Sequence, residues 1–129
     1  MKLVRKLWKH GIPAVRVLNT LPEYPAPDVI AFGKEVTVAF EVKHTSLPPE
    51  KINITLKHRQ AKRLLDFSLK TKSQPYVAVY VEKQDKWYVI PLQPLITFRK
   101  GLKQTNITWA KIRKYGVELE KLVELIAYG

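Results

Sequence analysis

The sequence predicts a mixed α/β domain in which a mixed β-sheet of about five strands is flanked by helices. Segments with helical periodicity stand at both ends of the chain and near its middle. Short runs rich in Val, Ile, Phe and Tyr lie between them, which gives the order helix, three strands, helix, two strands, helix. With 129 residues, of which 46% are hydrophobic, we expect a single domain over residues 1–129.

The first elements are a helix and a short strand. In residues 3–10 the apolar side chains gather on one face and the basic side chains on another, which predicts an amphipathic helix. Gly11 and Pro13 end this helix. Residues 14–18 (AVRVL) then predict a strand, and three prolines in residues 19–27 predict a loop.

The middle of the chain predicts a hairpin followed by a helix. Residues 28–32 and 35–44 are two apolar runs, and the Gly-Lys pair between them suits a two-residue turn. From residue 54 to residue 70 the pattern becomes helical. Asn53 or Thr55 is the candidate cap of that helix.

The last part of the chain predicts two strands and a helix. Residues 75–82 (PYVAVYVE) and 87–92 (WYVIPL) are the strands, and residues 117–127 carry a helical stripe of Leu, Val and Ile. Residues 98–114 are basic and weakly patterned, so no element is predicted there.

Composition and charge limit the class of protein. Lys and Arg number 23 against 11 Asp and Glu, so the net charge is +12 and the isoelectric point is near 10. A folded chain this basic predicts a polyanionic partner. The absence of cysteine excludes disulfide scaffolds, thiolate zinc sites and cysteine nucleophiles. No apolar run reaches the ~18 residues of a membrane span, and the N-terminus does not resemble a signal peptide. We therefore expect a cytoplasmic protein with no membrane partner.

The strand predicted at residues 35–44 has two different faces. Its even positions are uniformly apolar and must face a core; they are Val36, Val38, Phe40 and Val42. Its odd positions are mixed and include Glu41 and Lys43. Alternation alone explains the odd positions as a solvent face, and a lysine near a strand end is ordinarily solvated.

The predicted hairpin brings a second carboxylate to the mixed face. If the two residues between the strands form the turn, Asp28 pairs with Ala39 and lies diagonally next to Glu41. Diagonal neighbours lie roughly 7–8 Å apart, so the two carboxylates can converge on one ion. A turn longer by two residues preserves this arrangement, whereas an odd-length turn destroys it.

Asp28, Glu41 and Lys43 together form the candidate catalytic site. Two carboxylates suit a hard divalent cation such as Mg²⁺, which prefers oxygen ligands. A lysine ammonium can orient a water or stabilise negative charge on a phosphate in the transition state. In a strongly basic protein this combination favours metal-assisted hydrolysis of a phosphodiester.

A longer pattern surrounds these three residues. LWKHGIPAVRV is followed by a loop, APDVIAF, VAFEVKH and a helix that carries Gln60, over about residues 3–92. In order and spacing this resembles the archaeal-type Holliday junction resolvases, members of the PD-(D/E)XK nuclease superfamily. The resemblance implies a restriction-endonuclease-like fold, a homodimer and a dependence on Mg²⁺ or Mn²⁺. It also implies an endonuclease that resolves four-way DNA junctions by paired nicks in recombination and repair.

The resemblance assigns roles to single residues. Asp28 and Glu41 would be metal ligands, Lys43 the catalytic lysine and the backbone carbonyl of Val42 a further metal contact. Contacts to DNA would come from Arg16, Thr20 and Gln60. Independently of the resemblance, the basic face of the predicted helix suits a track of DNA phosphates, formed by Lys57, Arg59, Lys62 and Arg63.

One family feature has no counterpart in this sequence. The family carries a metal-binding glutamate in its first helix, at a position that falls just before Met1, and no acidic residue precedes Glu23. An upstream start would supply it. Otherwise the chain cuts without that carboxylate, or is a branched-DNA-binding protein of the same fold with reduced or lost cleavage. Another PD-(D/E)XK nuclease, acting on ends or nicked duplex, is a further alternative. A ribosomal-type RNA binder would explain the basic surface but not the acidic pair.

Overall fold

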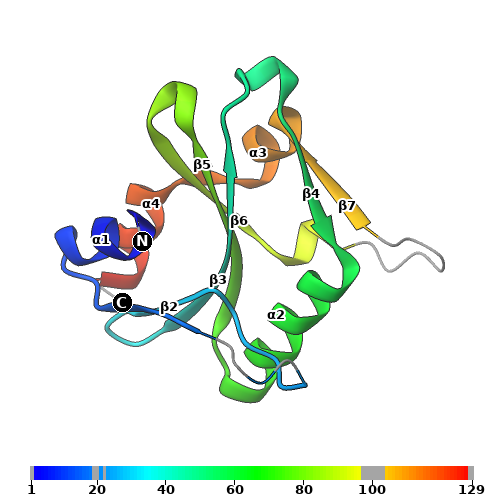
Figure 1. Ribbon diagram of the computed structural model, residues 1–129. Helices are drawn as coiled ribbons and strands as arrows, with labels where there is room; N and C mark the ends of the chain where they lie inside the picture. The colour runs from blue at the N-terminus through cyan, green and yellow to red at the C-terminus, as the bar shows by residue number, and fades with distance from the viewer. Residues whose placement is uncertain (1, 19–20, 22, 97–103, 128–129) are drawn as a thin grey trace.

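The computed structural model describes residues 2–18, 21, 23–96 and 104–127. Six strands form one mixed sheet with helices on both of its faces, and two more strands form a separate antiparallel ribbon (Figure 1). The predicted mixed sheet flanked by helices is confirmed, with six strands in place of about five. The additional strand is very short and precedes the last helix.

The large sheet has the strand order β1-β2-β3-β5-β6-β8. These strands are β1 (Ala14–Arg16), β2 (Val29–Phe32), β3 (Thr37–Thr45), β5 (Gln74–Val81), β6 (Lys86–Pro91) and β8 (Val117–Glu118). β3 and β5 are parallel, and every other neighbouring pair is antiparallel. Because parallel neighbours need a crossover connection, a ribbon strand and a helix lie between β3 and β5 in the chain.

Each face of the sheet is covered by its own layer (Figure 1). One layer consists of α1 (Lys2–Lys9) and α4 (Leu119–Ala127). The other consists of α2 (His58–Thr71), α3 (Trp109–Tyr115) and the ribbon of β4 (Asn53–Lys57) and β7 (Gln104–Thr108). α1 was predicted from its amphipathic pattern, and its Leu3 and Leu7 are fully buried one helical turn apart. Two separate hydrophobic cores result, one on each side of the sheet.

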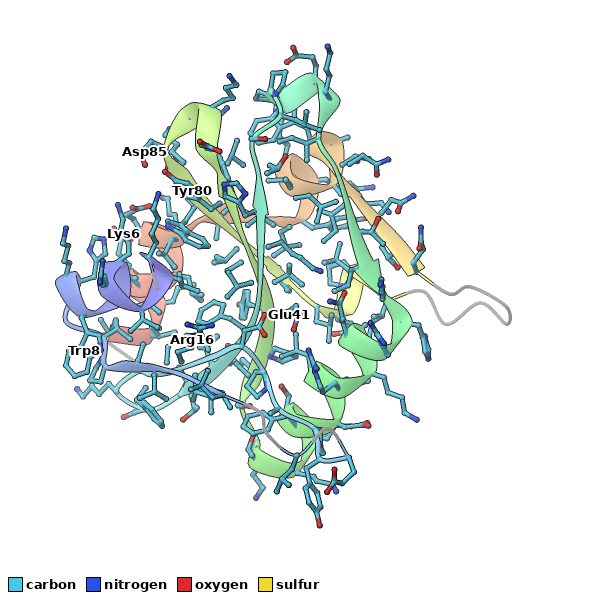
Figure 2. The ribbon with its side chains drawn as sticks, viewed as in Figure 1. Lys6, Trp8, Arg16, Glu41, Tyr80 and Asp85 are labelled. Carbon is cyan, nitrogen blue, oxygen red and sulfur yellow. The ribbon has the colours of Figure 1, made fainter. Side chains whose placement is uncertain are left out.

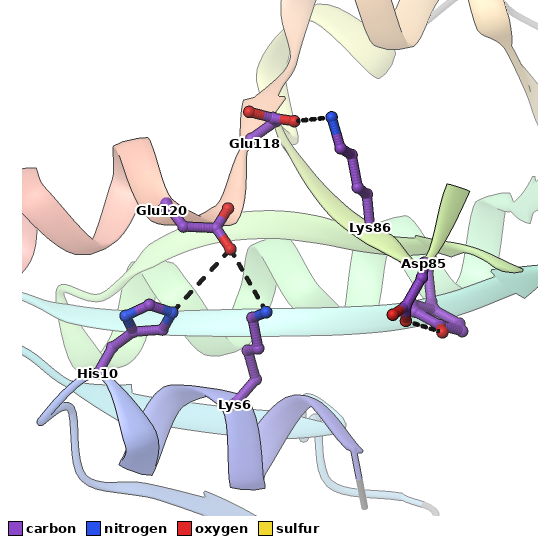
Figure 3. A network of polar contacts seen from close by, with 7 residues as sticks. Lys6, His10, Asp85, Lys86, Glu118 and Glu120 are labelled. Carbon is purple, nitrogen blue, oxygen red and sulfur yellow. Dashed lines mark hydrogen bonds and ion pairs between the residues drawn. The ribbon is translucent and has the colours of Figure 1, made fainter. Parts of the chain in front are cut away.

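Surface ion pairs also join α4 and the preceding strand β8 to their neighbours (Figure 3). Glu120 lies 3.5 Å from Lys6 and 4.0 Å from His10, and Glu118 lies 2.8 Å from Lys86. These side chains are about half exposed, so each pair contributes no more than about 1 kcal/mol. Burial of the apolar stripe of α4 therefore dominates the packing of this layer.

The segment predicted as the start of the central helix is a strand. In β4 the buried residues are Ile54 and Leu56, which alternate with the period of a strand. β4 pairs with β7, which lies in the stretch where the sequence predicted no element. Without a visible partner strand, these few residues were assigned to the longer helical pattern that follows them.

The start of α2 moves accordingly. The helix begins at His58, so the caps predicted at Asn53 and Thr55 are wrong. The structure instead places Lys57 at the N-cap, and the side chain of Gln60 accepts a hydrogen bond from the Lys57 backbone N–H at 3.0 Å. This bond satisfies one of the backbone donors that a helix N-terminus leaves unpaired.

The two-residue turn predicted between β2 and β3 is also wrong. Four residues separate Phe32 from Thr37, which pair with each other at the ends of the strands. Gly33 packs so closely on α4 that a Cβ there would lie 2.7 Å from the carbonyl oxygen of Ile126. The Lys34 N–H donates to that same oxygen at 2.8 Å. The four-residue turn therefore packs on α4 through both Gly33 and Lys34.

The remaining predictions for the second half are mostly confirmed. The two strands predicted at residues 75–82 and 87–92 are β5 and β6. The last helix is present, but its first two residues form β8. Residues 97–103 lie outside the described part of the chain. No helix that the structure describes is long and apolar enough to cross a membrane.

Candidate active site

The register of β2 and β3 brings the two predicted carboxylates together. Val29 pairs with Phe40, so Asp28 lies directly before the first pair on β2 and Glu41 directly after it on β3. The Asp28 N–H donates to the Phe40 carbonyl at 2.9 Å, which departs from the register of the strand pairs, so the regular pairing ends at Val29. The prediction placed the two residues diagonally. The four-residue turn shifts the register by one pair from that prediction, and the bond from the Val42 N–H to Asp28 Oδ2 at 2.8 Å holds the Asp28 carboxylate near Glu41.

Glu41 is buried in the protein interior. Glu41 is 3% exposed, and it lies on β3 where the strand passes beneath α2 (Figure 2). The neighbouring Ala39 on the same face belongs to the core under α2. The alternative that this face of the strand is a solvent face is therefore wrong, because α2 and the β4-β7 ribbon cover it.

The charge of Glu41 is poorly compensated. Its nearest cation is Arg63, whose Nη2 lies 3.5 Å from Glu41 Oε2, too long for a well-formed hydrogen bond. Glu41 Oε2 is buried and has no hydrogen-bond partner in the described structure, and the same holds for Arg63 Nε. Burial, followed by the nearby charge of Asp28, raises the Glu41 pKa from 4.5 to about 7. Arg63 and Lys43 oppose this rise but do not cancel it.

A divalent cation fits this pair of carboxylates. Glu41 Oε2, which has no hydrogen bond and only the distant Arg63 as a cation, would gain a close positive partner. Asp28 Oδ2 accepts a hydrogen bond from the Val42 N–H at 2.8 Å, which fixes the second carboxylate beside the first. In the described residues no group of three or more His, Asp or Glu side chains is arranged to hold a metal. Backbone carbonyls and waters would therefore complete the coordination, as is usual for Mg²⁺.

The predicted lysine and glutamine of the site are in direct contact. Lys43 Nζ donates to Gln60 Oε1 at 3.0 Å, and the same oxygen accepts the Lys57 N–H at 3.0 Å. Gln60 thus both caps α2 and holds the ammonium of Lys43. Lys43 lies two residues beyond Glu41 on β3, so the bond keeps the ammonium on the face that carries the two carboxylates.

The other predicted DNA contacts lie at different distances from this centre. On α2, Arg59 and Lys62 are exposed, whereas Arg63 turns toward Glu41. Arg16 is exposed on the edge strand β1. It pairs with Val29, whose side chain faces the core under α1 and α4, so Arg16 lies on the opposite face of the sheet from Glu41 (Figure 2). Thr20 is outside the described residues.

Sequence reasoning assigned Arg63 to the phosphate track and missed its contact with Glu41. The available signal was its spacing of three residues from Gln60, which puts both side chains on one face of α2. That signal becomes useful only when the position of α2 over β3 is known, because the sequence does not show which strand the helix covers.

The comparison with protein families decides the identity of the fold. A model described as archaeal Holliday junction resolvase (Hjc) matches residues 1–128. The chain belongs to the Hjc family. It is similar to a solved structure of Archaeoglobus fulgidus Hjc, a Holliday junction resolvase from an archaeal hyperthermophile, with a TM-score of 0.79. The two share 25% sequence identity over 95% of this chain and 94% of that chain.

Two further comparisons give a weaker structural match and no sequence match. A bacterial homing endonuclease gives a TM-score of 0.48 at 16% identity over 82% of this chain and 67% of that chain. A search of curated protein sequences finds no match. Membership of the Hjc family confirms the resemblance found in the sequence and the predicted class of enzyme. The chain is an endonuclease that acts on DNA junctions, and this nuclease fold depends on a divalent metal.

Proposed function

We propose that this Hjc-family chain hydrolyses phosphodiesters of a four-way junction at Asp28, Glu41 and Lys43, with Mg²⁺ or Mn²⁺ as the cation. The observation that carries the proposal is the buried and poorly compensated Glu41 near Asp28 in a protein of net charge +12. A protein that only binds DNA gains nothing from a desolvated carboxylate pair beside its phosphate-binding surface, because the pair repels phosphate.

Each residue of the centre has a separate task. Asp28 and Glu41 would hold the cation, with the Val42 carbonyl as a further ligand. When bound, the cation would supply positive charge that acidifies a water and neutralises the charge that develops on the phosphate. Lys43, oriented by Gln60, donates a hydrogen bond to the attacking water or to a phosphate oxygen.

Binding of the DNA would depend on its backbone. Three exposed cations lie at the N-cap and in the first two turns of α2, at the helix end that holds Gln60: Lys57, Arg59 and Lys62. Contacts of this kind attract phosphates without distinguishing the bases, which suits an enzyme that selects the form of its substrate. We assign Arg16 and Thr20 to the same task, on the basis of the family resemblance.

Two opposed cuts require two sites, and we propose that a homodimer supplies them. A two-fold dimer presents identical sites to the two symmetric strands of a junction. The edge of the sheet supports this proposal, since Val15 on β1 and Phe32 on β2 are 47% and 46% exposed. Both lie on the face of the sheet that carries Glu41. Exposed apolar surface of this kind is typical of a subunit interface.

The test is a cleavage assay on a labelled synthetic four-way junction and a duplex of matched sequence. Paired nicks in the junction alone, with Mg²⁺ or Mn²⁺ and not with EDTA, are the expected result. Lys43→Ala controls for contaminating nucleases and should leave the junction intact. Tight binding without nicks, or equal cleavage of junction and duplex, would contradict the proposal.

A further inference from the structure

A groove of about 570 Å³ lies between the segment before β2 and the part of α2 from Arg59 to Asp66. Its size falls within the range of pockets that enclose small ligands and cofactors, about 300–1,000 Å³. Arg63 belongs to its wall and also lies 3.5 Å from Glu41, so one side chain links the groove to the candidate site.

One face of α2 forms the helical wall of the groove. The lining residues Arg59, Lys62, Arg63 and Asp66 follow the spacing of neighbours on a helix surface. The opposite wall is formed by Glu23, Tyr24 and Pro25. Tyr24 is 61% exposed, so a large aromatic face borders a groove whose other wall is mostly cationic.

The composition of the groove differs from that of a simple phosphate track. A surface that follows a continuous backbone needs cations, and the carboxylates of Glu23 and Asp66 would repel it. Carboxylates instead accept hydrogen bonds from the amino groups on base edges. An aromatic ring offers a stacking platform to any base that has left its stack. Cations, carboxylates and an aromatic ring in one groove therefore suit a single nucleotide in an unstacked conformation.

We infer that this groove holds one unstacked nucleotide of the junction, next to the scissile phosphate. Its base stacks on Tyr24, its edge faces Glu23 and Asp66, and its phosphates contact Arg59, Lys62 and Arg63. Bases at a branch point lose a stacking neighbour at little cost, whereas a duplex must break a stack to fill the groove. The groove thus selects branched DNA over duplex. This inference rests on the proposed function, since it takes the carboxylate pair as the place of cleavage.

The test is a double-mutant cycle between the protein and the DNA, measured as junction affinity with Ca²⁺ in place of Mg²⁺. The protein variants are Tyr24→Leu and Tyr24→Phe, and the matched control is Tyr115→Leu, a partly exposed tyrosine on α3. In the junction, the nucleotides on either side of the scissile phosphate are replaced one at a time by an abasic residue.

Tyr24→Leu should weaken junction binding roughly 5- to 150-fold, the range of a lost base–aromatic stack. Tyr24→Phe and Tyr115→Leu should bind as wild type does, and duplex binding should not change. At one of the abasic positions, Tyr24→Leu should cause no further loss. Equal losses on junction and duplex, independent losses at every abasic position, or no loss at all would each overturn the inference.

The two proposals fail separately in this design. If wild-type protein neither cuts nor prefers the junction, the proposed function is wrong. If wild-type protein cuts the junction and Tyr24→Leu binds it normally, only the nucleotide groove is wrong. Because Tyr24 is largely exposed, the substitution should leave the fold intact, which thermal unfolding of each variant checks.

Discussion

Replacing Glu41 with Gln should make the metal-free protein more stable at neutral and alkaline pH. The side chain keeps its shape but loses the charge that burial and Asp28 disfavour. The Glu41 pKa rises from 4.5 to about 7 on folding. At about 1.4 kcal/mol per pH unit, this corresponds to about 3 kcal/mol, and Glu41 is buried enough for the conversion to apply.

The sign of the effect follows from proton binding. Below pH 4.5 both the folded and the unfolded state hold the proton, so Glu41 costs nothing. Between pH 4.5 and about 7 the folded state holds more protons than the unfolded state, so the free energy of unfolding of the wild type falls as the pH rises. Above about pH 7 the full cost of about 3 kcal/mol is present. Glu41→Gln does not titrate and escapes this cost.

The assay is urea unfolding of wild type and Glu41→Gln in EDTA at pH 4.5 and pH 8. The difference in free energy of unfolding between variant and wild type should increase by about 3 kcal/mol in favour of the variant. Glu124→Gln, at an exposed carboxylate on α4, controls for the loss of one surface charge. A difference that stays constant between the two pH values would refute the view that Glu41 is a poorly compensated buried carboxylate.

Four other substitutions test separate parts of the site and fold. Asp28→Asn keeps an acceptor for the Val42 N–H. Its cleavage rate should fall more than about 100-fold, and its junction binding should be unchanged or tighter; gel assays measure both. Lys62→Gln should reduce the slope of log binding constant against log salt concentration by about one, the value for one lost phosphate contact. An unchanged slope would exclude Lys62 from the phosphate track. Gln60→Ala should lower the free energy of unfolding by about 1 kcal/mol, because the helix cap is lost. The same variant should slow single-turnover cleavage up to about 100-fold, because Lys43 loses its hydrogen-bond partner. Gln60→Glu keeps an acceptor for the Lys57 N–H and should restore the stability. Gly33→Ala should destabilise the fold by about 1–3 kcal/mol in urea unfolding, because its Cβ would meet the backbone of α4 at 2.7 Å.

The sequence predicted the carboxylate pair because a strand has a strict period of two. Side chains alternate between the two faces of a strand, so any turn with an even number of residues places Asp28 and Glu41 on the same face. The exact register was wrong because the turn has four residues instead of two, and it packs on α4, a segment far away in the chain. Tertiary packing of this kind leaves no local signal.

The same distinction explains the other results. The strand β4 was missed because its pairing partner β7 follows about fifty residues later in a stretch with no clear pattern. The bond from Lys43 to Gln60 depends on the placement of α2 over β3, which the periodicity of α2 does not specify. Tyr24 belonged to a Pro-rich segment that the sequence identifies only as a loop, so its position beside α2 required the structure.

The most direct test of the central claim is an anomalous diffraction measurement on crystals soaked in Mn²⁺. One strong anomalous peak per chain should lie between the carboxylates of Asp28 and Glu41, within coordination distance of both, and it should be absent from crystals of Asp28→Asn. A peak bound elsewhere, or one that persists at full height in the variant, would contradict the assignment of these two carboxylates as the metal site of this nuclease.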